Sequence, residues 1–592
     1  MPSTFFGLNI GTSGLYTYQA ALNTTSHNIA NIDTKGYSRQ IVNQQAGVAI
    51  RMNSSYGMAG TGVIATSITQ ARDAYYDTKY RNNNSVYGAY SAKNYYMTEI
   101  ENYFNEVTVE GYTTTSNKFF DSLQSLSTNP SSLTDRTAVV NYAKSLTEYF
   151  NSLSNSLTSI QKESNFEVKN QVDKINSLGQ QIAAVTKQIN TLEARGTTAN
   201  DLRDQRELLL DNLSEIGNIS VTEHVVGMDV GVSSFVVKLE GQTLVNTDQY
   251  NTLQVVPRTT KENLNDADGL YDIQWSNGNN FGFQSSVSGG YLQSLLQVRD
   301  GNNGEVLSGE ITQVGTDTDT TSDTFGNRVI TLSGANLSLE KLNISTEGSI
   351  KIGNQTYQYK KMDVDTTTDP YEIKLTLDTT APIGTVGGSA TVGDSVPYKG
   401  IPYYMSQLNE LVRVFAKEYN SVHKTGYDLN GDKGTNFFSG TVPATGDNYD
   451  LDNESYYYLT ASNFTVSEEF FKDPKKIALS SDLNQGVENK DILDKLIKLK
   501  SDSTMFKQGT PSSFFQTMVA EVGIDSKKAS NSVDSQADIL KMITNQRLSI
   551  SGVDVDEEAM NLVLFQNAYN LSAKVISIMN EVYDKLINGT GV

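Results

Sequence analysis

Apolar side chains near the C-terminus recur at the spacing of a helix that packs lengthwise against another helix. Within residues 556–587 they follow one another in steps of four and three, and no Gly or Pro interrupts the stretch. This rhythm is that of a coiled-coil seam. Each seam residue left in water would forgo about 1.5–3 kcal/mol, so the helix needs a partner. The predicted seam consists of Leu564, Ala568, Leu571, Val575, Ile578, Val582 and Leu586.

The N-terminal stretch offers such a partner. Gly11, Gly14 and Thr25 weaken it, so by itself this segment should be a poor helix. Because neither terminal helix is stable without a partner, the pattern favours a chain whose two ends pair in one rod. Two ordinary core helices would give the same periodicity. An apolar residue recurs every seven positions, at Leu8, Leu15, Leu22 and Ile29.

Helical periodicity continues through much of the interior. Residues 166–194 keep a heptad rhythm that breaks only around Gly179. The pair Arg195-Gly196 ends this helix, and Asn200 is expected to cap a second helix over residues 201–214. The two would form a helical hairpin. Further helices are predicted over residues 70–104, 119–126, 135–157, 401–423, 514–522 and 526–551.

From about Ile219 the pattern changes to that of strands. Residues 349–352 and 356–359 alternate about Gly353-Asn354, which predicts a β-hairpin. Residues 371–377 alternate apolar and polar side chains, which predicts a half-buried strand. We therefore predict inserted β-rich structure, interrupted by one helix over residues 291–300.

These patterns predict an α+β, multidomain chain. Its terminal helices would pair as an axial coiled coil, followed by a long helical rod with inserted β-rich outer domains. The predicted divisions are residues 1–69 with 545–592 for the terminal pair and linker, 70–225 with 401–428 and 501–544 for the rod, 226–400 for the β-rich insertion or insertions, and 429–500 for a second insertion.

Composition narrows the classes of function. A chain of 592 residues is too long for one core, so three or four domains are expected. With 46 basic and 67 acidic residues, its formal charge of −21 argues against a nucleic-acid partner. The absence of cysteine excludes disulfides, thiol catalysis and cysteine metal sites. The 32 tyrosines suit wet interfaces between subunits.

No membrane or signal segment is expected. No run of about 18 apolar residues is present, and the first basic residue, Lys35, follows no continuous apolar core. If the protein reaches the outside, we expect a route other than the general secretory one.

Candidate chemistry is sparse. The three histidines, His27, His224 and His423, lie far apart, and we expect them at turns and on helix surfaces. Hydrolase and P-loop motifs are missing. Residues 428–432 (DLNGD) place oxygens at positions 1, 3 and 5 of a calcium-type loop, but Lys433 and Ser439 replace its later ligands. A tight Asx-rich turn is the favoured interpretation. We expect no catalytic, cofactor or metal site.

Three stretches together resemble one family, the flagellar axial proteins of the rod, hook and junction. They are residues 22–40, residues 201–214, and residues 551–558 leading into 565–575. The ending Gly-Tyr-Ser-Arg-Gln of the first stretch and the whole second stretch are typical of junction members. The resemblance covers the termini and the helical rod, but not residues 300–400 and 430–500. Its signature residues are Asn28, Asn31, Gly36, Tyr37, Arg39, Gln40, Asp204 and Arg206.

The resemblance implies a structural, non-enzymatic role in a ring between hook and filament. Both termini would line the central channel, with Leu8, Leu15, Leu22 and Ile29 against Leu564, Leu571, Val575, Ile578 and Val582. Expected partners are further copies in a helical ring, the hook protein, a second junction protein or the filament side, and an export chaperone on the C-terminal helix. The flagellar type III apparatus would export the chain uncleaved to the cell exterior.

Two other readings stay open. Another axial protein such as a hook protein is the nearer one. An enzyme that cuts wall polymer, with an acidic pair in the inserted region, is the remote one.

Overall fold

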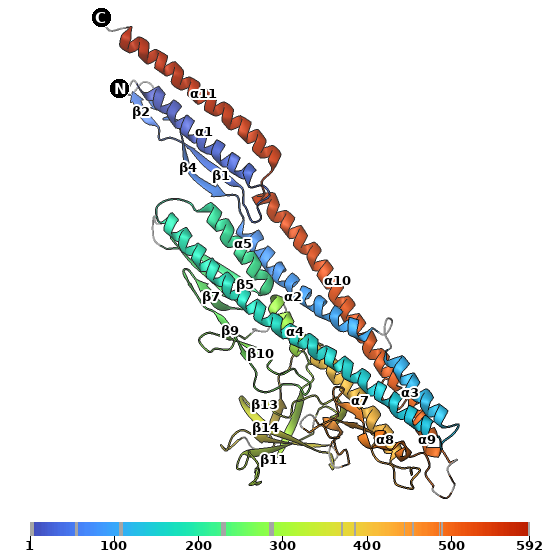
Figure 1. Ribbon diagram of the computed structural model, residues 1–592. Helices are drawn as coiled ribbons and strands as arrows, with labels where there is room; N and C mark the ends of the chain where they lie inside the picture. The colour runs from blue at the N-terminus through green and yellow to red at the C-terminus, as the bar shows by residue number, and fades with distance from the viewer. Residues whose placement is uncertain are drawn as a thin grey trace.

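The computed structural model describes residues 5–53, 57–105, 111–226, 232–282, 289–334, 336–368, 371–383, 386–442, 445–452, 455–482, 484, 486 and 489–589. The molecule is long and narrow (Figure 1). Two terminal helices lie at one end, a bundle of long helices forms the body, and β structure covers one side of the other half. No helix in these ranges is both long and apolar enough to cross a membrane.

The body contains longer helices than the sequence predicted. α4 (Leu133–Glu193) is a single helix of 61 residues, where two were expected. Residues 158–165 hold no Gly or Pro, so the backbone continues through them. Gly179, where the heptad rhythm breaks, is buried against Leu244 of β7 (Gln242–Asn246). The break in rhythm therefore marks a strand packing on the helix.

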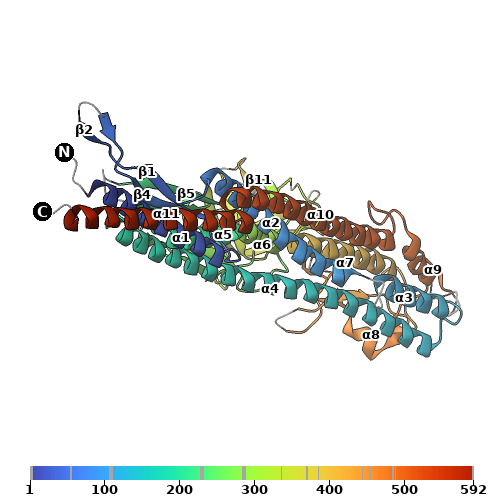
Figure 2. The same cartoon turned by 90° about the horizontal axis from the view of Figure 1, so that it is seen from above.

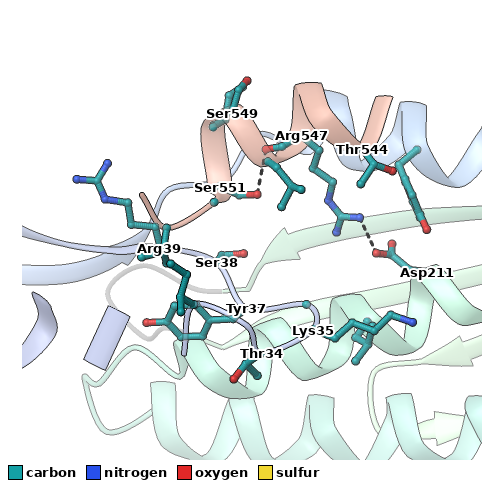
Figure 3. A pocket seen from close by; sticks show the side chains of 18 of the residues that line it. Thr34, Lys35, Tyr37, Ser38, Arg39, Asp211, Thr544, Arg547, Ser549 and Ser551 are labelled. Carbon is teal, nitrogen blue, oxygen red and sulfur yellow. Dashed lines mark hydrogen bonds and ion pairs between the residues drawn. The ribbon is translucent and has the colours of Figure 1, made fainter. Parts of the chain in front are cut away.

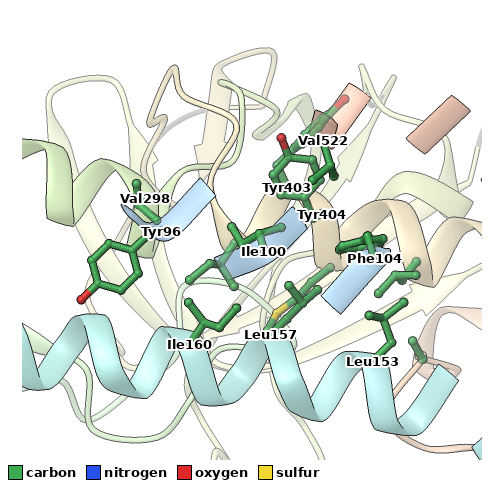
Figure 4. Packing of buried hydrophobic residues seen from close by; sticks show 14 of the residues in the cluster. Tyr96, Ile100, Phe104, Leu153, Leu157, Ile160, Val298, Tyr403, Tyr404 and Val522 are labelled. Carbon is green, nitrogen blue, oxygen red and sulfur yellow. The ribbon is translucent and has the colours of Figure 1, made fainter. Parts of the chain in front are cut away.

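The other helices of the body agree in place with the prediction. Two predicted segments near the C-terminus are again one helix, α10 (Pro511–Ser551), because the single Gly523 between them, with no Pro beside it, does not end the helix. Side chains of α2, α4, α6, α7 and α10 meet in one apolar core (Figure 4). The remaining helices are α2 (Ala74–Phe104), α3 (Tyr112–Leu126), α5 (Asn200–Ile216), α6 (Gly290–Asp300) and α7 (Ile401–His423).

The predicted helical hairpin forms between α4 and α5, through Gly196 at φ 81°. The predicted capping role of Asn200 is wrong, because Ala199 holds the cap position and makes no side-chain cap. The Asn200 amide instead donates to Gln40 Oε1 at 3.2 Å and to the carbonyl of Ile68 at 3.0 Å. Its side chain joins α5 to the N-terminal region.

The strands of the middle region fall into two sets, one that packs in the core of the helical body and one that has a core of its own. The antiparallel sheet β5-β6-β7-β8 and the pair β9–β10 lie on the helical body, and all of these strands except β8 bury side chains in its core. These strands are β5 (Ile219–Val225), β6 (Ser233–Leu239), β7, β8 (Gln249–Tyr250), β9 (Leu253–Pro257) and β10 (Tyr271–Trp275).

Six further strands close into a barrel with its own core, in the order β11-β12-β15-β14-β13-β16. The predicted hairpin is confirmed as β13 (Gly348–Ile352) and β14 (Gln355–Asp365), with Gly353 at φ 60° in the turn. The predicted strand at 371–377 is β15 (Glu372–Leu377), although closure of the barrel also buries Thr376. The others are β11 (Leu307–Thr316), β12 (Arg328–Ser333) and β16 (Ser389–Val392).

Residues after α7 form a small unit of short elements around buried aromatic rings. His423 was expected on a helix surface, but this unit folds over the end of α7 and buries it completely. Its Nδ1 donates to the carbonyl of Thr435 at 2.7 Å, and its Nε2 accepts from the backbone of Ala478 at 2.9 Å. Burial lowers the pKa of His423 to about 4, so the ring is neutral. The short elements of this unit and of its flanks are η1 (Leu339–Lys341), β17 (Phe438–Gly440), η2 (Tyr456–Tyr458), β18 (Phe464–Val466), α8 (Glu468–Lys472), η3 (Pro474–Lys476), α9 (Asp491–Lys498) and η5 (Leu499–Ser501).

Arg413 of α7 fastens both outer units to the body. It is 1% exposed, and its guanidinium donates to the carbonyls of Leu459, Tyr457, Glu340 and Leu342 at 2.6–3.0 Å. Burial lowers its pKa to about 10, which still leaves it charged at neutral pH. Four carbonyls thus replace the water that the buried cation has lost.

At the other end, α1 (Phe6–Ala30) and α11 (Val555–Asn588) lie side by side, with β1 (Gln40–Ala46) and β4 (Val63–Gln70) along α1 (Figures 1 and 2). β1 and β4 pair antiparallel. Beyond them, β2 (Ile50–Asn53) pairs with β3 (Gly57–Ala59).

The barrel should be removable without unfolding the helical body. The backbone N–H of Gly400 donates to the carbonyl of Gly301 at 3.2 Å, so the two ends of the insertion already meet. We expect deletion of residues 302–399, with Gly301 joined to Gly400, to retain a helical far-ultraviolet circular dichroism spectrum and a cooperative thermal transition. An equally long deletion starting at Leu292, which removes buried residues of α6, should lose both. Equal loss in the two variants would contradict a separate barrel core.

Candidate functional site

The three stretches singled out in the sequence meet at one place, the joint between the terminal helices and the body (Figure 3). The turn after α1 supplies residues 32–39, and the α10–α11 connection supplies residues 551–554. The lining residues of α5 are Leu208, Asp211, Asn212 and Glu215. These segments surround a cavity of about 840 Å³. Segments more than 500 residues apart in the sequence therefore contact one another here.

Asn28 is the hydrogen-bonding centre of the joint and is 1% exposed. Its Nδ2 donates to the carbonyl of Gln40 at 2.9 Å and to Glu558 Oε2 at 3.2 Å. Its Oδ1 accepts from the Tyr37 hydroxyl at 2.7 Å and from the Gln40 backbone at 2.9 Å. Every polar atom of this amide side chain is thus engaged, which ties the end of α1 to β1 and to the first turn of α11.

Arg39 clamps the start of α11. Its Nε donates to Glu558 at 2.7 Å, and its two terminal nitrogens donate to the two oxygens of Glu557 at 2.8 and 3.1 Å. Glu558 is 2% exposed and Glu557 is half exposed. The backbone N–H of Arg39 also donates to the carbonyl of Ser551 at 2.8 Å. A buried carboxylate is stable only with such partners.

A network of buried charges continues from the clamp into the body. Ser38 donates its backbone N–H to Asp204 at 3.0 Å, and Arg72 pairs with Asp204 at 3.3 Å and with Asp77 at 2.6 Å. Arg547 of α10 pairs with Asp77 at 2.8 Å and with Asp211 of α5 at 2.6 Å (Figure 3). The network consists of Arg72, Arg81 and Arg547 with Asp77, Asp204, Glu207 and Asp211.

The network lowers the pKa of the Glu207 carboxyl group. Burial alone would raise its pKa, but the neighbouring guanidinium groups of Arg81 and Arg72 lower it to about 2. Since an unfolded glutamate titrates near ~4.3, the stability that Glu207 contributes is fully present above that pH. It is lost as the pH falls through about 2. The joint is therefore built to hold at neutral pH.

Sequence reasoning missed most of this network. It named Asp204, but not the arginines on α2 and α10 that pair with α5. A signal was present: Asp204, Glu207 and Asp211 are spaced three and four apart, which puts three acids on one helix face. A solvated face was the simpler interpretation, because the cations come from distant segments.

The other signature residues have separate places. Gly36 adopts φ 85° in the turn after α1 and lies against Leu208. The Asn31 amide donates to the carbonyl of His27 at 3.0 Å. Arg206 is buried outside the joint, where it pairs with Glu223 at 2.9 Å and its guanidinium lies 3.7 Å from the Phe235 ring centre. The Gln40 side chain donates to Asp201 at 2.7 Å.

The terminal helices touch through small residues. A Cβ placed on Gly11 would lie 2.9 Å from Ile576, and one on Gly14 would lie 2.8 Å from the Ser572 hydroxyl. The glycines that weaken α1 as an isolated helix therefore let α11 approach closely. From the sequence alone, these glycines were expected only to weaken the helix.

The predicted seam remains largely open in a single chain. Leu8, Leu15, Leu22 and Ile29 are half-buried. On α11, Val575 contacts the Gly11 position, yet it is 42% exposed. The role of these residues as an axial seam stays a prediction about the assembled state. Leu564, Leu571, Ile578 and Val582 are 61%, 68%, 47% and 48% exposed.

The remaining chemical candidates have structural contacts. His27 lies 3.3 Å from Asp201, and His224 is exposed on β5. Asp428 Oδ1 accepts from the backbone of Asn430 and of Asp432 at 2.8 Å each, which is the predicted Asx turn. Among the described residues, no group of three or more His, Asp or Glu side chains is placed to hold a metal ion.

Removing the Arg39 cation should loosen the joint. Arg39→Met leaves Glu558 buried beside Asn28 without its charged partner, and we expect the free energy of unfolding to fall by about 2–4 kcal/mol. The same substitution should accelerate backbone hydrogen exchange in the first turn of α11. The matched control is Arg195→Met at the exposed end of α4, which should change stability by less than about 0.5 kcal/mol. Equal effects of the two substitutions would show that the clamp contributes nothing.

Comparisons with known proteins agree on one group. A family model described as flagellar hook-associated protein FlgK helical domain matches residues 97–334 and 316–438. Models of the flagella basal body rod protein and of the flagellar basal body rod FlgEFG protein C-terminal region match residues 8–37 and 541–589.

Two relatives named flagellar hook-associated protein 1 align over nearly their whole length. The one from Bacillus subtilis (strain 168) is 27% identical over 604 residues, covering 100% of this chain and 99% of the relative. The one from Escherichia coli (strain K12) is 27% identical over 600 residues, covering 98% and 99%. A solved flagellar hook junction protein FlgK from Burkholderia pseudomallei is similar with a TM-score of 0.44 and 14% identity, over 80% of this chain and 100% of that one.

Proposed function

The chain belongs to the family of flagellar hook-associated proteins that carry the FlgK helical domain, and from this we infer that it is a structural protein of the hook–filament junction in the bacterial flagellum. The observation that supports this function most directly is the family match across the helical body, which spans more than half of the chain. Models of basal body rod proteins alone match only the two termini. A junction protein is therefore favoured over a rod or hook protein.

We propose that copies of the chain form a helical ring with the terminal helices at its axis. Head-to-tail contacts, which use two different surfaces of each copy, continue an array instead of closing a dimer. The exposed apolar side chains of α11 support this arrangement, because they need cover that α1 does not supply. The hook protein would lie on one side of the ring, and a second junction protein or the filament on the other.

The proposed domain division follows the same arrangement. Residues 1–69 with 545–592 form the axial part, and 70–225 with 401–428 and 501–544 form the rod. Residues 226–400 and 429–500 would be the outward insertions. The separate core of the barrel supports this for β11–β16, whereas β6, β7, β9 and β10 share the core of the helical body. The role is mechanical and not catalytic.

Export by the flagellar type III apparatus, without cleavage, is part of the proposal. α1 contains glycines at its contact face and α11 leaves its apolar face open, so each terminus is a weak structure until it is covered. A chaperone that covers the open face of α11 before export would meet the same need.

Deletion of the gene tests the function directly. We expect hooks without attached filaments and flagellin shed into the medium, by electron microscopy of the cells and immunoblotting of the culture fluid. Complementation with the intact gene should restore attached filaments. Normal filaments in the deletion strain would refute a junction role, and loss of the hook itself would indicate a hook protein.

The axial seam can be tested by placing charge on α11. Leu571→Asp combined with Val575→Asp should abolish filament attachment and weaken chaperone binding, since each carboxylate would be buried without a partner. Phe325→Asp, at an exposed phenylalanine of the barrel region, is the control that should leave both unchanged. If the double variant attaches filaments normally and still binds the chaperone, the seam lies elsewhere.

A further inference from the structure

A two-stranded arm, described over residues 47–53 and 57–62, projects from the terminal end of the molecule (Figure 2). β2 and β3 pair with each other and with no other described strand. A Cβ placed on Gly57 would find no atom within 4 Å. Three large apolar side chains of the arm are exposed: Val48 to 85%, Ile50 to 52% and Met58 to 64%. Because an isolated two-stranded hairpin is marginally stable in water, the arm is suited to contact another molecule.

The joint cavity has apolar and charged lining residues that could receive the arm. Ile32, Leu548 and Ile550 line it and remain 38–53% exposed. Of its charged lining residues, Asp33 and Glu215 form no ion pair within the described ranges. A volume of about 840 Å³ is in the range of clefts that hold several side chains.

Charge adds a second match between the two surfaces. Arg51 is the one charged residue of the arm. The cavity is lined by five carboxylates and three cations. Arg39 and Arg547 pair with Glu557 and Asp211, so the remaining charged lining residues are Lys35 and the three acids Asp33, Glu215 and Asp554. An apolar arm with one cation fits an apolar-rimmed cavity with an excess of acid.

One chain cannot bring its own arm to its own cavity. The arm begins beside the N-terminal half of α1, where Gly62 lies against Ile10 and the backbone N–H of Val63 donates to Ser13 at 3.3 Å. The cavity lies beyond the other end of α1, on the order of 30 Å away along the helix axis. In Figure 1 β2 lies beside the N-terminus, so the arm points away from the joint.

We propose that the arm of one copy docks in the joint cavity of the next copy in the ring. Arm and cavity are different surfaces, so the contact is head-to-tail and leaves a free arm and a free cavity at every addition. Neighbouring copies would then be staggered along the axis by on the order of 30 Å. The inference rests on the proposed junction role and adds the partner surfaces of that assembly.

Cysteine pairs test the contact cleanly, because the chain contains no cysteine. Met58→Cys combined with Leu548→Cys, oxidised in isolated hook–filament structures, should give a ladder of cross-linked multimers. The matched controls combine Met58→Cys with Leu571→Cys on α11 or with Phe325→Cys, at side chains that are 68% and 57% exposed. These pairs, each single variant and the unassembled protein should give no ladder.

The outcomes separate this inference from the junction role. If the protein is present in hook–filament structures with filaments attached but the cavity pair gives no product, or gives dimers only, the arm contact is overturned alone. A ladder from the Leu571→Cys pair instead would place the arm on α11 and also overturn it. If the protein is absent from those structures, the junction role itself fails.

A charge exchange gives a second test that needs no cross-link. Arg51→Glu should lower the number of attached filaments about tenfold, the change that corresponds to about 1.4 kcal/mol. Arg51→Glu combined with Glu215→Arg should restore the number to within about twofold of the parent, as in a double-mutant cycle. An unchanged count in the single variant, or no recovery in the double variant, would overturn the contact.

Discussion

Carboxylates and guanidinium groups that are withdrawn from water must be paired, and at the joint this requirement decides how the ends of the chain meet the body. Glu558 is buried at the start of α11, and its partners Asn28 and Arg39 come from the opposite end of the sequence. Arg39 also binds both oxygens of Glu557, and such a bidentate contact of arginine fixes direction as well as distance. The terminal helices can therefore attach to the body in one orientation.

A different kind of contact operates along the terminal helices themselves. Glycines of α1 allow α11 to approach, and this brings the helices together without covering the apolar face of α11. The single chain thus fixes the orientation of its terminal helices at the joint but leaves the apolar face of α11 uncovered. That division suits a subunit whose orientation is set internally and whose remaining surface is buried by other copies.

Much of this could be predicted from the sequence, and the failures have physical causes. Helix periods and the β13–β14 hairpin are local properties, and they were predicted correctly. The continuity of α4 was missed because the mostly polar residues 158–165 interrupt the apolar pattern, although they contain no Gly or Pro that would end a helix. The burial of His423 and the pairing of Glu207 depend on segments distant in the sequence, which no local pattern reveals.

Electron cryo-microscopy of the hook–filament junction in intact flagella tests the central claim most directly. The account predicts α1 and α11 of every copy around the central channel, with Arg39 still in contact with Glu558 and the β barrel on the outer surface. Terminal helices on the exterior of the tube, or a joint in which Arg39 and Glu558 have separated, would contradict it.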